Sequence, residues 1–126
     1  MLQHILLEID FKVLIKNDNF APRPVKIGHD VWIGYGVIIL DGANIGTGAI
    51  IWAGVVIRGN VPPHAVVIGN PGTIIKYRFN TVEIEKLMKS KWWELPQDSL
   101  LKIENLSYSK DVETLVSKVM ELKIAV

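Results

Sequence analysis

The stretch IGHDVWIGYGVIILDGANIGTGAIIWAGVVIRGNVP, residues 27–62, carries an isoleucine at every sixth position. The isoleucines stand at 27, 33, 39, 45, 51 and 57, and a small apolar residue follows each of them four positions later, ending with Val61. Neither the alternation of a β-strand nor the period of an α-helix produces this spacing. A fixed short period is typical of a solenoid, in which each repeat packs on the next.

The six-residue unit predicts a coil with three sides. If each hexapeptide forms one flat side, three of them make one turn of about 18 residues, with the isoleucines stacked inward and glycines at the corners. Successive turns then pair as parallel β-strands. A glycine-rich sandwich is the ordinary alternative, but its strands alternate with a period of two and its turns are unevenly spaced. We therefore expect an all-β solenoid followed by C-terminal α-helices.

Three zones divide the chain. Residues 1–26 contain short apolar runs broken by polar residues and prolines, which indicates an N-terminal strand and loop segment. Residues 27–79 hold the repeat and its exit loop. Residues 80–126 are rich in helix formers, and Asn80 with Glu83 suits a capping box at the start of a helix. A second helix is expected after Pro96, and apolar residues spaced by three and four indicate a third.

Composition excludes several classes of partner. The chain has 126 residues, with 14 lysines and arginines against 13 acidic residues, so a formal charge of +1 gives no reason to expect nucleic acid or an anionic membrane. It has no cysteine, which fits a reducing compartment and removes a thiol nucleophile and thiolate metal ligands. No run is long and apolar enough for a membrane span. We expect a cytoplasmic protein.

The repeat and its exit, VKIGHDVWIG through VVIGNPG, resemble the hexapeptide-repeat acyltransferases. The tail IEKLMKSKWWELP is similar to their xenobiotic branch, which includes the chloramphenicol- and streptogramin-type acetyltransferases. The resemblance implies a left-handed parallel β-helix, a homotrimer and transfer of acetyl from acetyl-CoA to a hydroxyl group of a small molecule, such as an antibiotic-like compound or a sugar. Compared with that branch, the chain is expected to be a member shortened at its N-terminus.

In the family a histidine acts as general base and takes the proton of the acceptor hydroxyl. It lies upstream of a stretch that matches Pro24 to Gly28, so the resemblance implies His4 as the catalytic residue, with Glu8 or Asp10 to orient its ring. An ordinary histidine near a chain end is the alternative for His4.

The other two histidines receive no catalytic role. His29 stands at a variable repeat position and is expected to be a surface histidine, and His64 follows two prolines in a loop.

The resemblance also implies five residues that contact the coenzyme. Arg58 and Lys76 match positions whose cations hold phosphate groups, and Ala53 would offer its backbone to the pantetheine arm. Gly59 and Thr73 complete the set, although each departs from the residue common in the family. The alternative is that Arg58 and Lys76 only solvate a corner and a loop.

The tryptophans are expected to pack rather than react. Trp32 and Trp52 occupy repeat positions that face outward and suit a subunit interface, whereas Trp92 and Trp93 are expected to dock the C-terminal helices.

Two alternatives to the acetyltransferase remain. One is a catalytically degenerate, non-enzymatic trimer that serves as a binding or scaffold protein. The other is a γ-class carbonic anhydrase, which shares the solenoid but needs zinc-binding histidines at the equivalents of Tyr35 and Leu40, where this sequence has none. No metal is expected.

Overall fold

The computed structural model describes residues 22–107 and 111–125, and the repeat forms very short strands in three sheets. Each strand of the repeat ends on one of the periodic isoleucines, which turns inward, while its neighbour turns outward. The first sheet consists of β1 (Lys26–Ile27), β4 (Asn44–Ile45) and β7 (Asn60–Val61). The second consists of β2 (Trp32–Ile33), β5 (Ile50–Ile51), β8 (Ala65–Ile68) and β9 (Thr73–Tyr77), and the third of β3 (Ile38–Ile39) and β6 (Val56–Ile57).

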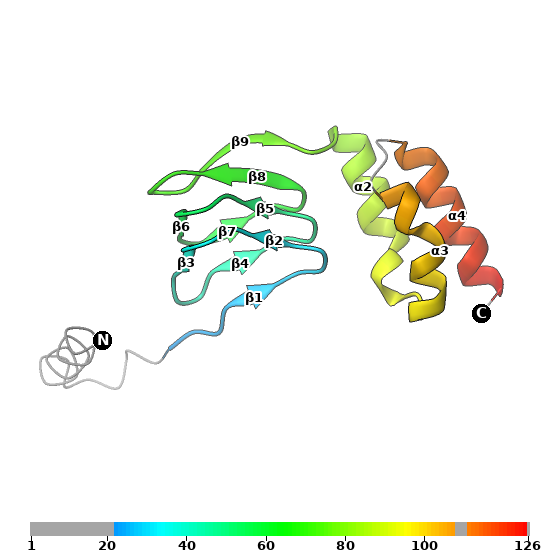
Figure 1. Ribbon diagram of the computed structural model, residues 1–126, viewed down its shortest axis with the longest axis horizontal. Coiled ribbons are helices and arrows are strands. Elements are labelled where there is room, and N and C mark those ends of the chain that lie inside the picture. Colours follow the sequence, from blue (N-terminus) through cyan, green and yellow to red (C-terminus); the bar gives the residue numbers. More distant parts are fainter. Residues whose placement is uncertain (1–21, 108–110, 126) are drawn as a thin grey trace, which may run out of the picture.

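The strands are parallel and pair with an offset of 18 residues. Ile27 pairs with Ile45, Ile33 with Ile51, and Ile39 with Ile57, so the chain visits the three sheets in turn before it returns to the first. This offset confirms the expected turn of three hexapeptides. Figure 1 shows the strands stacked from β1 at the bottom to β9 at the top.

The interior of the coil is filled by the two periodic columns. Ile45, Ile51 and Ile57 are at most 2% exposed, and the small residues between them are fully buried. The first turn is different, because Ile27 and Ile33 are 49% and 40% exposed at the lower end of the stack. Burial of the columns is therefore complete only from the second turn upward.

The third turn departs from the expected spacing. Asn44 pairs with Asn60 and Ile45 with Val61, an offset of 16 residues, so Val61 occupies an inward isoleucine position and not the small position that the period predicts. The loop at Arg58 and Gly59 is two residues shorter than the other corners, which shifts everything after it.

The exit from the coil also differs from the expectation. The segment GNPGTII was predicted to form a last partial turn of the coil, but β9 turns back and pairs antiparallel with β8, Thr73 lying opposite Ile68. The loop at residues 69–72 crosses β6, where the amide of Gly72 donates to the Val56 carbonyl at 3.0 Å. This hairpin covers the upper end of the stack.

Three α-helices follow β9, as the sequence predicts. Helix α2 (Thr81–Ser90) begins with the expected capping box, in which the amide of Glu83 donates to the Asn80 side chain and the amide of Asn80 donates to the Glu83 carboxylate. The short 3₁₀ helix η1 (Trp92–Glu94), helix α3 (Gln97–Ser107) and helix α4 (Val112–Ala125) complete the unit.

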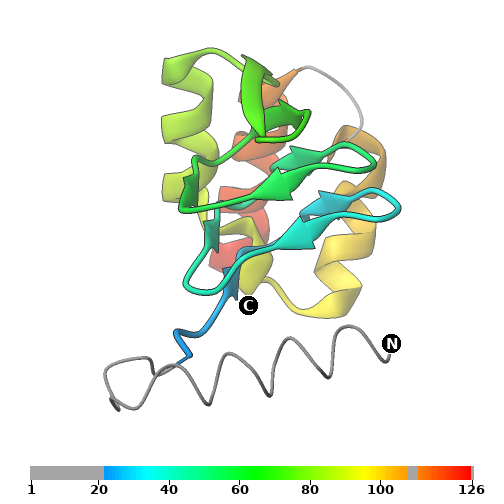
Figure 2. The same ribbon diagram turned by 90° about the vertical axis from the view of Figure 1, so that its left-hand side faces the viewer.

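The helices form a second core of their own beside the coil. This core contains apolar residues from η1 and all three helices, with partners on either side. Its buried members are Leu87, Leu95, Ile103, Val112, Leu115, Val119 and Leu122. Figures 1 and 2 show the helical unit standing against one side of the coil, away from β3 and β6. Among the helices of the described residues, none is both long and apolar enough to cross a lipid bilayer.

Candidate functional site

The residues implied by the resemblance are only partly visible. His4, proposed as the general base, and Glu8 and Asp10, proposed to orient it, lie outside the described residues. The five coenzyme positions are all described, and all are exposed.

Within one chain the five coenzyme positions do not converge. Thr73 pairs with Ile68 at the end of β8, and Ala53 follows β5 at the same end of the second sheet. Arg58 and Gly59 lie at the next corner, between β6 and β7. Lys76 lies opposite Val66 on the upper edge of the second sheet. The set is therefore spread along the outer surface, and no single pocket in the described part of the chain holds it.

His29 is exposed, as expected, but it contacts the helical unit. Its ring stacks on Trp93 with the ring centroids 5.0 Å apart and the planes 6° from parallel, and Trp92 meets Trp93 edge to face. Trp92 packs against the core of the helical unit. The prediction that the paired tryptophans dock the helices is confirmed.

One corner of the coil, between the first and second sheets, faces the helices. Its three turns place Asp30, Gly48 and His64 above one another, and each has a positive φ, of 53°, 73° and 59°. Glycine adopts this left-handed backbone without penalty, and aspartate and histidine are among the side chains that enter it more often than most. Two chemically active side chains thus occupy positions where the repeat elsewhere uses glycine.

His64 is buried, in contrast to the loop histidine that the sequence suggests. It is 3% exposed, its ring meets Phe79 edge to face at 5.3 Å, and among the described residues neither ring nitrogen has a hydrogen-bond partner. Burial, together with the Arg78 cation, lowers the pKa of His64 from 6.5 to about 4. The imidazole is therefore neutral at pH 7.

Arg78 connects this corner to the first helix. Its backbone amide donates to the His64 carbonyl at 2.8 Å, and its Nη1 donates to the Gly48 carbonyl at 2.9 Å. The same nitrogen lies 3.9 Å from a carboxylate oxygen of Asp30. The guanidinium thus ties all three turns of the corner together.

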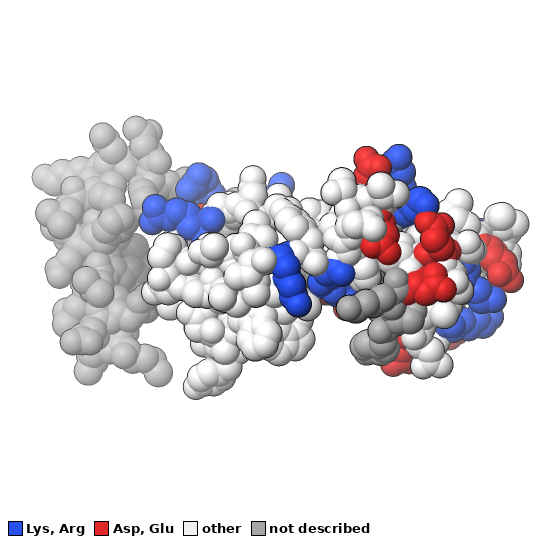
Figure 3. Space-filling model, turned by 90° about the horizontal axis from the view of Figure 1, so that it is seen from above, with Lys and Arg blue, Asp and Glu red and all other residues white. Residues whose placement is uncertain are grey.

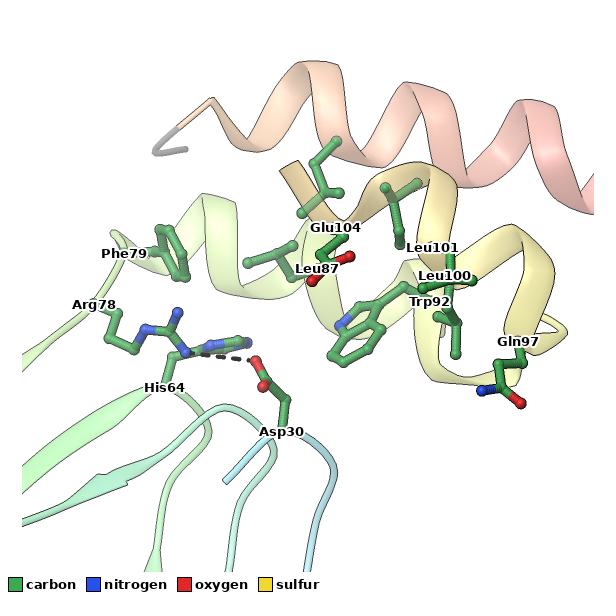
Figure 4. A pocket seen from close by; sticks show the side chains of 12 residues that line it. Asp30, His64, Arg78, Phe79, Leu87, Trp92, Gln97, Leu100, Leu101 and Glu104 are labelled. Carbon is green, nitrogen blue, oxygen red and sulfur yellow. Dashed lines mark ion pairs between the residues drawn. The ribbon is translucent and has the colours of Figure 1, made fainter. Parts of the chain in front are cut away.

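A cavity of about 260 Å³ lies between this corner and the helices. Figure 4 shows Asp30, His64 and Arg78 on the side of the coil, with apolar residues of the helical unit facing them. The further lining residues are Phe79, Leu87, Trp92, Gln97, Leu100, Leu101, Ile103, Glu104 and Leu115. This cavity combines a mostly apolar wall with a few polar groups, which is the usual composition of a small-molecule site.

Sequence reasoning did not find this cavity. A signal was available in the corner positions, where aspartate and histidine replace glycine. Its meaning depends on the docking of helices that lie far along the chain, which a repeat pattern does not contain.

Charge and metal ligands add two observations. Seen from above, the coil shows few charged side chains, and most acidic ones gather over the helical unit (Figure 3). Within residues 22–107 and 111–125, no three histidine, aspartate or glutamate side chains come together as a metal site would require.

Comparison with known proteins gives the family. The family described as "Bacterial transferase hexapeptide (six repeats)" matches residues 24–59. A protein of Lysinibacillus sphaericus named "Probable macrolide acetyltransferase" is 40% identical over 93 residues, which cover 73% of this chain and 52% of that protein. A chloramphenicol acetyltransferase of Agrobacterium fabrum is 39% identical over 89 residues, covering 71% of this chain and 43% of the relative.

Solved structures also match part of the repeat region. A maltose O-acetyltransferase from Clostridium difficile is 51% identical with a TM-score of 0.43, covering 44% of this chain and 29% of that chain. A galactoside acetyltransferase in complex with coenzyme A is 38% identical with a TM-score of 0.43, covering 44% and 28%.

The chain spans about half the length, or less, of these curated relatives. The sequence match nevertheless falls on the residues that form the coil. The chain belongs to the bacterial transferase hexapeptide family and is related to its chloramphenicol and macrolide acetyltransferases.

Proposed function

We propose that the chain acts as an O-acetyltransferase, moving an acetyl group from acetyl-CoA to a hydroxyl of a small, antibiotic-like or sugar molecule. The observation that carries the proposal is the 40% identity over 93 residues to a protein named as a macrolide acetyltransferase. A region of about that length includes more than the 36 residues of the family match, so the likeness extends beyond a generic repeat.

The chemistry requires little of the protein beyond placement. A general base takes the proton of the acceptor hydroxyl, the oxygen attacks the thioester carbonyl, and the thiolate of coenzyme A leaves. Backbone N–H groups can stabilise the oxyanion that forms between these steps. We propose His4 as the base, on the basis of the family pattern upstream of Pro24.

The described histidines are poorly suited to that role. His29 is stacked on Trp93, and His64 is buried with a pKa of about 4, so both are committed to the junction with the helices. Neither lies at the end of the sheets where Ala53 and Thr73 are found. Their placement supports a base from elsewhere in the chain.

We also propose that the coil is left-handed and that three copies pack side by side. The outward residues support the assembly, because those of the first sheet are polar whereas those of the second and third are apolar. The polar column is Lys26, Asn44 and Asn60, and the apolar columns are Trp32, Ile50 and Val66, and Ile38 and Val56. Two different apolar faces on one chain suit a ring, in which each copy contacts its neighbours through unlike surfaces.

Such a ring would supply the groove that one chain lacks. Ala53 and Thr73 flank the third sheet on one side, and Arg58 flanks it on the other. A neighbouring copy packed along this sheet would bring one chain's Arg58 or Lys76 toward the other's Ala53. Both exposed cations suit the phosphate groups of acetyl-CoA.

The test is calorimetric titration of the purified chain with acetyl-CoA, with the mass measured by light scattering on the same sample. We expect a trimer that binds acetyl-CoA, and at least about tenfold weaker binding by Arg58→Ala and Lys76→Ala, because each removes a charge-assisted contact. Lys26→Ala, an exposed cation on the polar sheet, is the matched control and should bind normally.

Turnover then tests the base. Release of free coenzyme A thiol with hydroxylated acceptors should fall strongly in His4→Ala while acetyl-CoA binding is kept. A folded trimer that does not bind acetyl-CoA would contradict the enzyme and support the alternative, a non-catalytic scaffold that has kept its solenoid.

A further inference from the structure

The cavity between the coil and the helices has a polar floor and an apolar wall. His64, Arg78 and Asp30 form the floor, on the corner of the coil. The wall comes from the helical unit and from the chain that leads into it (Figure 4). Its apolar members are Phe79, Leu87, Trp92, Leu100, Leu101, Ile103 and Leu115.

His64 is the group on the floor that lacks a partner. It is 3% exposed, and neither Nδ1 nor Nε2 forms a hydrogen bond within the described residues. Buried polar atoms in folded proteins almost always have a partner, so a side chain with two unpartnered nitrogens beside a cavity indicates a ligand group. A neutral imidazole offers one donor and one acceptor.

The charges around the floor select a neutral ligand. Arg78 already donates to the Gly48 carbonyl and lies 3.9 Å from the Asp30 carboxylate, so its charge is balanced. Glu104 adds a carboxylate to the lining and disfavours an anion. A cation would lie close to the Arg78 guanidinium. An uncharged hydroxyl can donate to one imidazole nitrogen or accept from the other.

Size and wall composition define the rest of the ligand. A cavity of about 150 Å³ holds a single benzene ring, so about 260 Å³ suits a compact molecule of roughly two fused rings. Trp92 and Phe79 offer aromatic surfaces to such a ring.

We propose that this cavity is a binding site for a neutral aromatic alcohol, whose hydroxyl hydrogen bonds to His64 and whose rings pack against Trp92 and Phe79. The site lies at the opposite end of the second sheet from Ala53 and Thr73, so it is separate from the proposed coenzyme groove. The proposal is independent of acetyl transfer and would hold in a scaffold protein as well.

The probe is 2-naphthol, which is neutral at pH 7, titrated into the full chain by calorimetry. Naphthalene, without the hydroxyl, and 2-naphthoate, with a charge, are measured beside it. We expect saturable binding of one naphthol per chain, at least about tenfold weaker binding of naphthalene, and no binding of naphthoate, because one buried hydrogen bond is lost or a charge is introduced.

Three variants locate the binding. His64→Phe should weaken 2-naphthol at least about tenfold and leave naphthalene unchanged, because only the hydrogen bond is removed. Leu101→Trp tests the site without altering the floor, since Leu101 lines the cavity but is 62% exposed, and its larger ring should obstruct 2-naphthol. His29→Phe changes a histidine of the same corner that does not line the cavity, and it should bind normally.

Absence of saturable binding, or binding that Leu101→Trp leaves unchanged, would overturn the site. Equal affinity for 2-naphthol and naphthalene would overturn the role of His64. Loss of acetyl-CoA binding in Arg58→Ala with normal naphthol binding would show that the two proposals stand or fall separately.

Discussion

The ring of His64 lies directly over the α-carbon of Gly48, so that a β-carbon on Gly48 would come within 2.2 Å of Nδ1. The two residues occupy the same corner in successive turns, and both have a positive φ. Glycine at 48 is therefore required for two reasons, the left-handed backbone and the space that the imidazole fills. The corner that carries the helices depends on this close contact.

Replacing Gly48 with alanine should destabilise the fold more than the same change at Gly54. Gly54 has nearly the same φ, of 75°, but nothing lies within 4 Å of its β-carbon position. Gly54→Ala should cost about 1–2 kcal/mol of unfolding free energy for the backbone alone, and Gly48→Ala about 1–3 kcal/mol more for the overlap with His64. Urea denaturation measures both, and equal losses would show that the ring moves aside freely.

His64 should make stability depend on pH between 6.5 and about 4. Its pKa falls from 6.5 to about 4 on folding, so within this window the unfolded chain binds a proton that the folded chain does not. Stability is therefore kept above pH 6.5 and is lost as the pH falls toward 4. Thermal denaturation across this range should show a smaller loss in His64→Phe than in the parent chain. His29→Phe is the control, and if it flattened the profile equally, the assignment to His64 would be wrong.

The capping box of α2 should contribute about 1 kcal/mol to stability. Asn80 accepts from the amide of Glu83 at 2.8 Å, and its loss in Asn80→Ala leaves that amide without a side-chain partner. Urea denaturation followed by far-ultraviolet circular dichroism measures the effect. Glu85→Ala, an exposed change within the same helix, should alter stability by less than about 0.5 kcal/mol. An equal loss in both variants would argue against the cap.

Assembly should depend on the apolar outer faces and not on the polar one. Trp32 and Ile38 are each 56% exposed in the single chain, so a glutamate at either position should leave the coil folded. Trp32→Glu and Ile38→Glu should raise the dissociation constant of the assembly at least about tenfold, because each places a charge in an apolar contact. Asn44→Glu, on the polar first sheet, should have no such effect. Light scattering over a dilution series distinguishes these results, and an unchanged mass for all three variants would contradict side-by-side packing through these faces.

Much of the fold is local and periodic, which explains why the sequence predicts it. An isoleucine every six residues needs only the neighbouring turn to be buried, so the columns through Ile45, Ile51 and Ile57 follow from spacing alone. The start of α2 follows from Asn80 and Glu83, which lie within one helical turn of each other.

The errors lie where one residue type suits two positions. Val61 has the size of either column, and only the shorter corner at Arg58 and Gly59 decides that it pairs with Ile45. The burial of His64 depends on Gly48, 16 positions earlier, and on Phe79 from the helical side, and no local pattern links these three. The coenzyme positions were assigned by resemblance, and their convergence remains a prediction because it requires more than one chain.

The 18-residue offset makes the placement of the helices a matter of counting. A segment of 18 residues added within the repeat would lengthen the coil by one turn and return every later strand to its own sheet. A segment of six would move the chain on by one side, so that the exit through β9 and Arg78 would face a different sheet and leave the corner of Asp30 and Gly48. Length changes in this protein are therefore tolerated in steps of a whole turn, and the two-residue deletion in the last turn falls after every corner of the first two turns has been set.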